Sequence, residues 1–433
     1  MDRMVPNLLR TYRARVVTPV IVEARADMFS RVRTALKETV PVHLLEPSIR
    51  TFLPRIFKIF EVPLTKWKQI PTFNMVATIL TPNLIEEVAQ WREVEKIYPD
   101  YVKWALSVPP TGIFLDRRGE SFTTTYWTKR AIGADRANEQ GFTGKGIRVL
   151  VADTGVRSSH PQLRRVRAYS AMMEKGGSGF DGNGHGTHCV STVGGTRAID
   201  PFYKVPVEGM APECDLVSVQ CLGFIIGMGM TSDVLEAMEM ALTLRAKVLS
   251  MSLGSEEQVP DEENPEAVAI NNLVENGVIP VIAAGNSGPG SRTVGSPGSV
   301  RNALTVGAWD AINNQLCDFS SRGPSANDEI KPDVLAPGYR VDSALIGFLD
   351  TMVDKLQYHY GSISGTSMAT PHVAGLVGCI AQMYRERVGK ELTVEEIKRM
   401  MSELGHEKDN DEGWGLLTWE IVERWVESEY GII

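Results

Sequence analysis

The sequence lacks any run of about 18 consecutive apolar residues, the length that a membrane-spanning helix needs. Its five cysteines are scattered and form no CxxC pair, which argues against a zinc ribbon and a disulfide framework. Residues 1–17 carry charge without an apolar core or a small-residue cleavage site, so they do not resemble a secretory signal. We therefore expect no membrane partner. The compartment stays unknown: the protein acts inside the cell, or a signal was removed.

An excess of positive charge is also missing. Lys and Arg number 45 against 53 Asp and Glu, a net charge of −8, which does not favour nucleic acid as the main ligand. The charge is unevenly divided, because residues 1–110 hold 16 basic and 11 acidic side chains, and the rest hold 29 and 42. A basic leading segment followed by an acidic body suggests two domains that attract one another.

The first hundred residues predict a small α+β unit. Hydrophobic periodicity favours the order strand, helix, strand, strand, helix, strand, a βαββαβ unit with two helices on one face of an open sheet. Residues 107–125 are rich in proline, glycine and threonine and read as a linker. We expect domains over 1–106 and 126–433. The strands are predicted at 16–22, 56–62, 74–80 and 94–97, and the helices at 28–38 and 82–91.

From residue 147 onward, short buried strands alternate with helices. This alternation of strands and helices predicts a doubly wound α/β domain with a mostly parallel sheet and helices on both faces. Functional groups in such sheets collect beyond the carboxyl ends of the strands. The strands are predicted at 147–152, 216–221, 247–253, 278–284 and 303–308, and the helices at 232–246, 265–276 and 368–387.

Three polar residues stand beside glycines at the ends of these elements. Asp153 closes the first strand in the string DTG, His185 opens a helix in GHGTH, and Ser367 opens a long apolar helix in GTSMATPH. A serine nucleophile needs a histidine to accept its proton and a carboxylate to orient that histidine. The three are therefore candidates for a nucleophilic triad.

A fourth candidate follows the strand at 278–284. Asn286, in the string AAGNS, is expected at the same edge of the sheet as the other three. Its side-chain amide can donate to a tetrahedral oxyanion beside the backbone N–H of Ser367. Alternatives for single motifs remain open: HGTH also fits a metal pair without a third ligand, and His188 and His372 fit structural roles.

The strings DTG, HGTH, AAGN and GTSMATPHVAG, in this order, resemble the subtilisin-like serine peptidases over about residues 125–390. The resemblance implies a peptidase domain that cleaves peptide bonds through an acyl-enzyme. It implies that Asp153 orients, that His185 is the general base and acid, that Ser367 is the nucleophile and that Asn286 donates to the oxyanion.

Substrate binding is implied by the same resemblance. Two strands pair with an extended peptide in this family, and a broad, apolar-leaning first pocket is expected. The corresponding positions are Ser252, Leu253 and Gly254 on one side, Gly227 and Gly229 on the other, and Gly295 at the pocket floor.

The N-terminal unit is similar to the ferredoxin-like inhibitory pro-domains of this family. The resemblance implies an autoprocessed zymogen in which the chain's own pro-domain chaperones folding and blocks the active site until it is cut. The cut is expected between Leu106 and Phe122.

One position departs from the family's pattern. Gln162 stands where many relatives place a calcium-ligating Asp, and residues 195–209 lack the usual Asn-rich loop. Calcium needs several oxygen ligands, preferably charged ones. We therefore expect no tight calcium site and no required cofactor, with Asp310 as a candidate for a weaker cation site.

Two other functions remain open. One is a silent or permanently capped relative that binds peptides through the same groove. The other is a serine esterase, which usually carries a G-x-S-x-G turn, whereas Ser367 lies in GTSMA.

Overall fold

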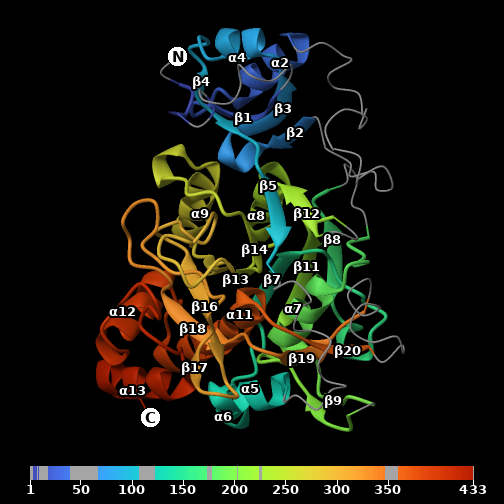
Figure 1. Ribbon diagram of the computed structural model, residues 1–433, viewed down its shortest axis with the longest axis vertical. Helices are drawn as coiled ribbons and strands as arrows, with labels where there is room; N and C mark the ends of the chain where they lie inside the picture. The colour runs from blue at the N-terminus through green and yellow to red at the C-terminus, as the bar shows by residue number, and fades with distance from the viewer. Residues whose placement is uncertain are drawn as a thin grey trace.

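The computed structural model describes residues 3–6, 8, 18–39, 67–106, 122–172, 178–201, 203–223, 227–346 and 359–432. The strand predicted at 56–62 and most of the predicted linker lie outside these residues. Figure 1 shows an N-terminal unit (blue) seated on a larger body, with strand β5 (Val102–Ala105) running from the unit into the body.

The described part of the N-terminal unit contains one antiparallel sheet and the helices α2 and α4. Its strands lie in the order β2-β3-β1-β4. Strand β2 begins five residues after the end of the range predicted at 56–62. Thr81 caps α4 by accepting from the Leu84 amide, and Pro82 occupies its first turn. The elements are β1 (Thr18–Ala24), α2 (Phe29–Thr39), β2 (Trp67–Ile70), β3 (Met75–Leu80), α4 (Pro82–Val88) and β4 (Val94–Pro99).

The body is built on one large sheet, and the predicted mostly parallel α/β architecture is confirmed. Its order is β17-β16-β15-β13-β7-β11-β8, with β18 also paired to β16, and β17 alone among these strands runs antiparallel to its neighbour. The strands are β7 (Arg148–Asp153), β8 (Arg167–Ser170), β11 (Asp215–Gln220), β13 (Val248–Met251), β15 (Ile279–Ala283), β16 (Leu304–Asp310), β17 (Gln315–Leu316) and β18 (Val334–Pro337).

Helices cover both faces of this sheet. On β7, Val149 and Val151 belong to one core with α7 (His185–Gly194) and α11 (Thr366–Met383). Leu150 and Ala152 point the other way, into a core with α8 (Thr231–Thr243) and α9 (Pro265–Glu275). The N-terminal unit contributes to this second core, so its sheet packs over the α8–α9 face (Figure 1).

A three-stranded sheet joins the unit to the body. Strand β5 lies between β12 (Met228–Met230) and β14 (Leu253–Gly254) and is antiparallel to both. The unit therefore sends one extended strand into the edge of the body where the candidate site residues were expected.

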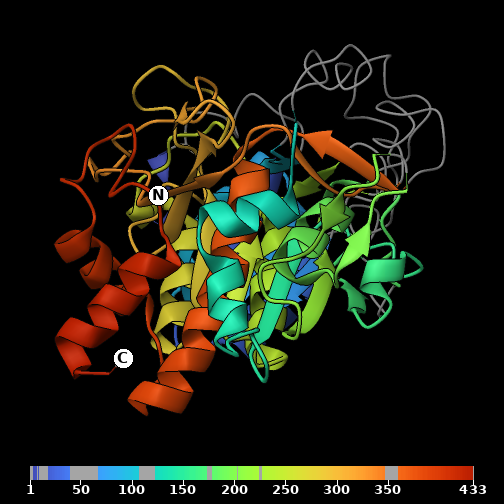
Figure 2. The same cartoon turned by 90° about the horizontal axis from the view of Figure 1, so that it is seen from below.

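The remaining described elements lie around the body, except the 3₁₀ turn at Pro71–Phe73, which belongs to the N-terminal unit. They were not predicted, apart from the π-helical turn, most of which falls in the helix predicted at 368–387. Figure 2 shows the C-terminal helices (red) at one side. In the described part of the chain, no helix is both long and apolar enough to cross a membrane. These elements are β6 (Thr123–Thr124), α5 (Thr125–Ala131), α6 (Ala134–Glu139), β9 (Ala198–Ile199), β10 (Pro206–Val207), β19 (Val341–Ala344), β20 (Tyr360–Ile363), α12 (Val394–Leu404) and α13 (Trp419–Tyr430), with short 3₁₀ turns at Pro71–Phe73, Pro161–Leu163 and Asp261–Glu263 and a π-helical turn at Tyr384–Val388.

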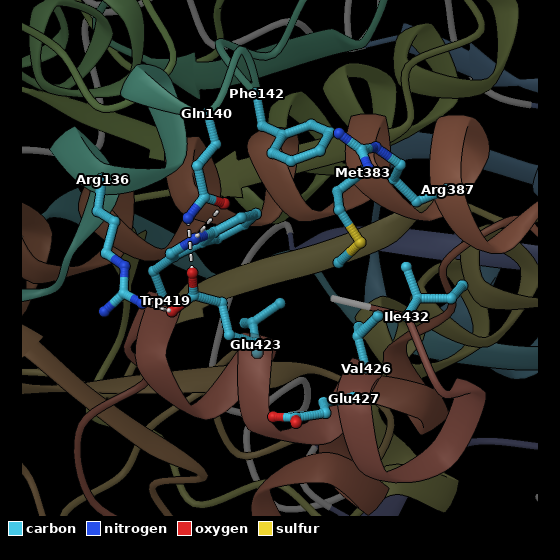
Figure 3. A pocket seen from close by; sticks show the side chains of 11 residues that line it. Arg136, Gln140, Phe142, Met383, Arg387, Trp419, Glu423, Val426, Glu427 and Ile432 are labelled. Atoms are coloured by element: carbon cyan, nitrogen blue, oxygen red, sulfur yellow. Dashed lines mark hydrogen bonds and ion pairs between the residues drawn. The ribbon is translucent and has the colours of Figure 1, made fainter.

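A cavity of about 410 Å³ lies between α6, the end of α11 and α13 (Figure 3). Its floor is apolar, with Phe142, Met383 and Trp419, and its rim carries the ion pair between Arg136 and Glu423. None of its lining residues is a candidate site residue.

Candidate active site

Asp153 and His185 meet at the carboxyl end of β7. Asp153 is the last residue of β7, and His185 is the first residue of α7. The His185 Nδ1 lies 2.7 Å from the Asp153 Oδ1, and the same oxygen accepts from the Thr154 amide at 2.7 Å. Both side chains are completely buried. The carboxylate thus fixes the orientation of the ring and leaves Nε2 facing the other way.

The start of α7 is organised by Asp181, which the sequence reasoning missed. Its carboxylate accepts from the amides of Gly184 and Thr187, each at 2.8 Å, and from the hydroxyls of Thr187 and Thr154. Burial raises the pKa of Asp181 to about 6, although these hydrogen bonds oppose the shift. An Asp four residues before the histidine, with glycines between, was the available capping signal.

The pKa of His185 lies well above its ordinary value. Burial of the ring acts to lower it, but the adjacent Asp153 carboxylate outweighs burial through its charge and hydrogen bond. This pair therefore stabilises a protonated imidazole, the form that a general base reaches when it takes a proton.

Ser367 lies beside this pair, in the first turn of α11, but its hydroxyl is not hydrogen-bonded to His185. The Ser367 Oγ donates to the Ser252 carbonyl at 3.0 Å, and the buried His185 Nε2 has no partner among the described residues. Cys189 bridges the two: its thiol donates to the Ser367 carbonyl at 3.4 Å and lies 3.9 Å from the His185 Nδ1. Rotation about the Ser367 Cα–Cβ bond, between staggered positions, redirects the hydroxyl.

Within the described residues, one group of three potential metal ligands comes together, namely Asp153, His185 and Cys189. A cysteine binds metal as the thiolate. Burial raises the pKa of Cys189, and its thiol donates to a carbonyl, so the protonated form is favoured. These contacts fit packing beside the Asp–His pair better than metal binding.

Asn286 follows β15 and presents its amide to a peptide carbonyl. Its Oδ1 accepts from the amide and the hydroxyl of Thr366, at 2.9 and 3.0 Å. This holds Nδ2 on the opposite side, where it donates to the Leu106 carbonyl at 2.9 Å. The amide therefore points at a main-chain oxygen that enters the site from the N-terminal unit.

The two segments implied for substrate binding flank β5. The amide of Ala105 donates to the Gly227 carbonyl, and the amide of Leu106 donates to the Ser252 carbonyl at 3.2 Å. Register pairs Leu253 with Ala105, Gly254 with Trp104 and Gly229 with Lys103. The chain thus lies as an extended strand between these two segments.

At Gly295 two backbone segments approach closely. A Cβ built there would lie 1.7 Å from the Ser255 carbonyl, so the glycine allows this approach, and its place at the pocket floor stays a prediction. The residue whose missing side chain faces Leu106 is Gly254, where a Cβ would lie 3.3 Å from the Leu106 side chain.

The side-chain amide of Gln162 donates two hydrogen bonds to loop carbonyls. Its Nε2 donates to the carbonyls of Thr196 and Val207, at 2.5 and 3.2 Å, while its Oε1 accepts from Ser191. Loop carbonyls that could face a cation therefore face an amide, and the residues present do not fit calcium here. The Asp310 carboxylate accepts hydrogen bonds within its own turn, from the amides of Ile312 and Asn313 and from the Asn313 side chain.

The other two helical histidines bond elsewhere. His188 Nε2 lies 2.9 Å from the Val341 carbonyl, and His372 Nε2 lies 2.6 Å from the Thr128 hydroxyl. Burial lowers the pKa of His188 to about 3 and that of His372 to about 4, so both rings stay neutral.

Comparison with known proteins agrees with this geometry. Residues 144–415 match the Subtilase family. The chain is 36% identical over 297 residues to the serine protease AprX of Bacillus subtilis, an alignment covering 64% of each chain. It is 34% identical to the M-protease of Shouchella clausii over 64% of this chain and 66% of that one. It is 36% identical to subtilisin Savinase of Lederbergia lenta over 59% of this chain and 84% of that one.

The buried Asp–His pair, the adjacent serine and the family match define the class: this chain belongs to the subtilase family of serine peptidases. It spans just under two thirds of the length of AprX and of the M-protease.

Proposed function

We propose that this protein is a serine endopeptidase made as a zymogen that cuts itself. The observation that carries the proposal is the Leu106 carbonyl, which accepts from Asn286 while the Leu106 amide donates to Ser252, next to Ser367. A peptide held this way presents its carbonyl as a substrate would.

The geometry supports the following reaction. Ser367 Oγ attacks the Leu106 carbonyl carbon and gives its proton to the free Nε2 of His185, while Asp153 stabilises the imidazolium. The negative oxygen is held by Asn286 and by the Ser367 N–H, which lies in the first turn of α11 where helix amides lack internal partners. His185 then gives the proton to the leaving amine, and an ester between Ser367 and Leu106 remains. Water hydrolyses this ester, with His185 again acting as the base.

The N-terminal unit acts as the pro-domain in this proposal. Its contacts with the body include buried charges: Lys68 pairs with Asp233 at 2.5 Å, and Asp100 accepts from the amide and hydroxyl of Ser232, at the start of α8. These contacts dock the unit so that β5 fills the groove. The processing bond is the one that follows Leu106, at one end of the range expected from sequence.

The first pocket of the groove takes an apolar side chain in this proposal. Leu106 occupies that position, and Gly254 leaves the space beside it open. Peptide and protein substrates with an apolar residue before the cleaved bond should therefore enter without strong charge selection.

No cation is required in this proposal. Gln162 holds the loop carbonyls that a calcium ion would otherwise bind, through two donated hydrogen bonds. The reaction uses only groups of the protein itself and water.

The test is covalent labelling with a serine-directed phosphonate, followed by peptide mass spectrometry. The proposal expects one adduct, on Ser367, and parallel loss of protein hydrolysis. A protein that keeps residues 1–106 attached, takes no label and hydrolyses nothing would instead be a capped peptide-binding relative.

A further inference from the structure

Lys103 is the buried residue of β5. Its neighbours Val102 and Trp104 are 37% and 42% exposed, whereas Lys103 is 1% exposed, because alternate side chains of a strand point to opposite faces. Counting back from the bond that follows Leu106, Lys103 is the fourth residue. Its side chain therefore occupies the fourth subsite of the groove.

The ammonium of Lys103 meets three acceptors of the body. The Lys103 Nζ lies 2.7 Å from the Glu266 Oε2, 3.3 Å from the Ser255 Oγ and 3.3 Å from the Ser296 carbonyl. A lysine ammonium has three N–H donors. The number and the placement of these acceptors thus match the three donors of a lysine ammonium.

Glu266 belongs to the body and is held there independently of β5. It lies in the first turn of α9, where its amide donates to the Asn264 side chain, and its Oε2 accepts from the Ser296 hydroxyl. Its side chain is 1% exposed, and its Oε1 has no partner among the described residues. When β5 leaves the groove, the Glu266 carboxylate loses its counter-ion and keeps its hydrogen bond from Ser296.

A carboxylate attracts a cation more strongly inside a closed groove than in bulk water, so the groove favours a peptide that places a cation beside Glu266. We propose that Glu266 selects substrates with a lysine four residues before the cleaved bond. This inference rests on the proposed peptidase function. It adds that the protein prefers lysine-containing segments with an apolar residue directly before the cut.

A second interpretation of the Lys103–Glu266 pair is that it only holds the pro-domain in place, as a lock. The two interpretations predict different results once the N-terminal unit has been removed. A lock acts on residues 1–106 alone, whereas a specificity residue also acts on unconnected peptides.

The experiment uses the processed enzyme and peptides that copy β5, Val-X-Trp-Ala-Leu followed by the same short tail, with X as lysine, norleucine, arginine or glutamate. We expect kcat/KM for the lysine peptide to exceed that for norleucine by at least about tenfold, and that for glutamate by more. Arginine should fall between lysine and norleucine, because its planar fork does not match the three acceptors.

The variant Glu266→Gln should lose the preference for lysine over norleucine while it still cleaves the norleucine peptide. The matched control is Glu262→Gln, because Glu262 is an exposed acid just before α9. The peptide series with the unmodified enzyme tests the inference even if Glu266→Gln fails to fold.

Equal cleavage of the lysine and norleucine peptides by the unmodified enzyme would overturn the inference and leave the proposed function standing. Failure to cleave any peptide or protein would instead count against the proposed function itself, and the specificity assignment would fall with it.

Discussion

The carbonyl oxygen of Leu106 accepts a 2.9 Å hydrogen bond from the side-chain amide of Asn286, although the two residues lie 180 positions apart in sequence. The amide is oriented by Thr366, the residue before Ser367, through two hydrogen bonds to its Oδ1. Ser367 and Asn286, which we propose as the nucleophile and the oxyanion donor, are thus fixed to one another by the start of α11. The position of one peptide carbonyl between them links the N-terminal unit to the chemistry of the body.

Replacing Asn286 by alanine should lower kcat by about 10²–10³, the loss known for the corresponding donor of subtilisin itself, with little change in KM. The reason is that this amide is worth most when the carbonyl oxygen becomes negative. Steady-state kinetics on a soluble peptide measures both parameters. Ser287→Ala is the control, because the Ser287 hydroxyl contacts Glu256 and not Leu106. A kcat equal to that of the control would remove Asn286 from the oxyanion site.

The pH dependence should report the His185–Asp153 pair. Because the pKa of His185 lies above its ordinary value of about 6.5, the neutral base predominates only at higher pH, and kcat/KM should rise through a midpoint above that value. Asp153→Asn should lower kcat on the order of 10⁴ and move the midpoint down, because burial then acts on the ring without the carboxylate.

A pH–rate profile of each variant checks this prediction. Asp328→Asn is the matched control, since its side chain is 76% exposed and pairs only at the surface with Arg292. A midpoint that stays in place in Asp153→Asn would show that another group sets the profile.

Leu106→Asp should slow self-processing by about 10–100-fold, because a charged side chain replaces an apolar one at the first pocket. The rate is read from the disappearance of the full-length chain on a gel. Val102→Asp adds the same charge to β5 at an exposed position and should process normally. If both variants process at the same rate, the bond after Leu106 is not the one that is cut.

Removal of calcium should leave the melting temperature of this protein unchanged, because Gln162 already donates hydrogen bonds to the loop carbonyls of Thr196 and Val207. Gln162→Asp should lower the stability by about 1–3 kcal/mol, since it removes donors from two carbonyls and places a carboxylate against them. Added calcium should then recover part of the loss.

Thermal unfolding with and without a chelator gives both results. Gln315→Asp, at an exposed position of β17, is the control for the added charge. A large drop in the melting temperature of the unmodified protein on chelation would contradict this account of Gln162.

Much of the body could be predicted from local patterns. Short buried runs such as 147–152 and 278–284 have the composition of strands covered on both faces, and the motifs at their ends identified Asp153 and Asn286. The helices α12 and α13 carried readable signals as well, because Thr393 and Thr418 cap them, yet they were not predicted.

Other features depend on contacts that no local pattern reveals. Strand β5 pairs with β12 and β14, which lie more than 100 residues further along the chain, so its four residues alone do not predict a strand. The pair between Lys103 and Glu266 joins residues 163 apart. The position of the Ser367 hydroxyl on Ser252 depends on a side-chain rotation, which a sequence pattern does not fix.

The most direct measurement is the intact mass of the purified chain over time, for the unmodified protein and for Ser367→Ala. The account predicts that the unmodified chain separates into a fragment ending at Leu106 and one beginning at Ser107. It predicts that Ser367→Ala keeps its full mass under the same conditions. Cleavage after Leu106 in Ser367→Ala at the unmodified rate would contradict it.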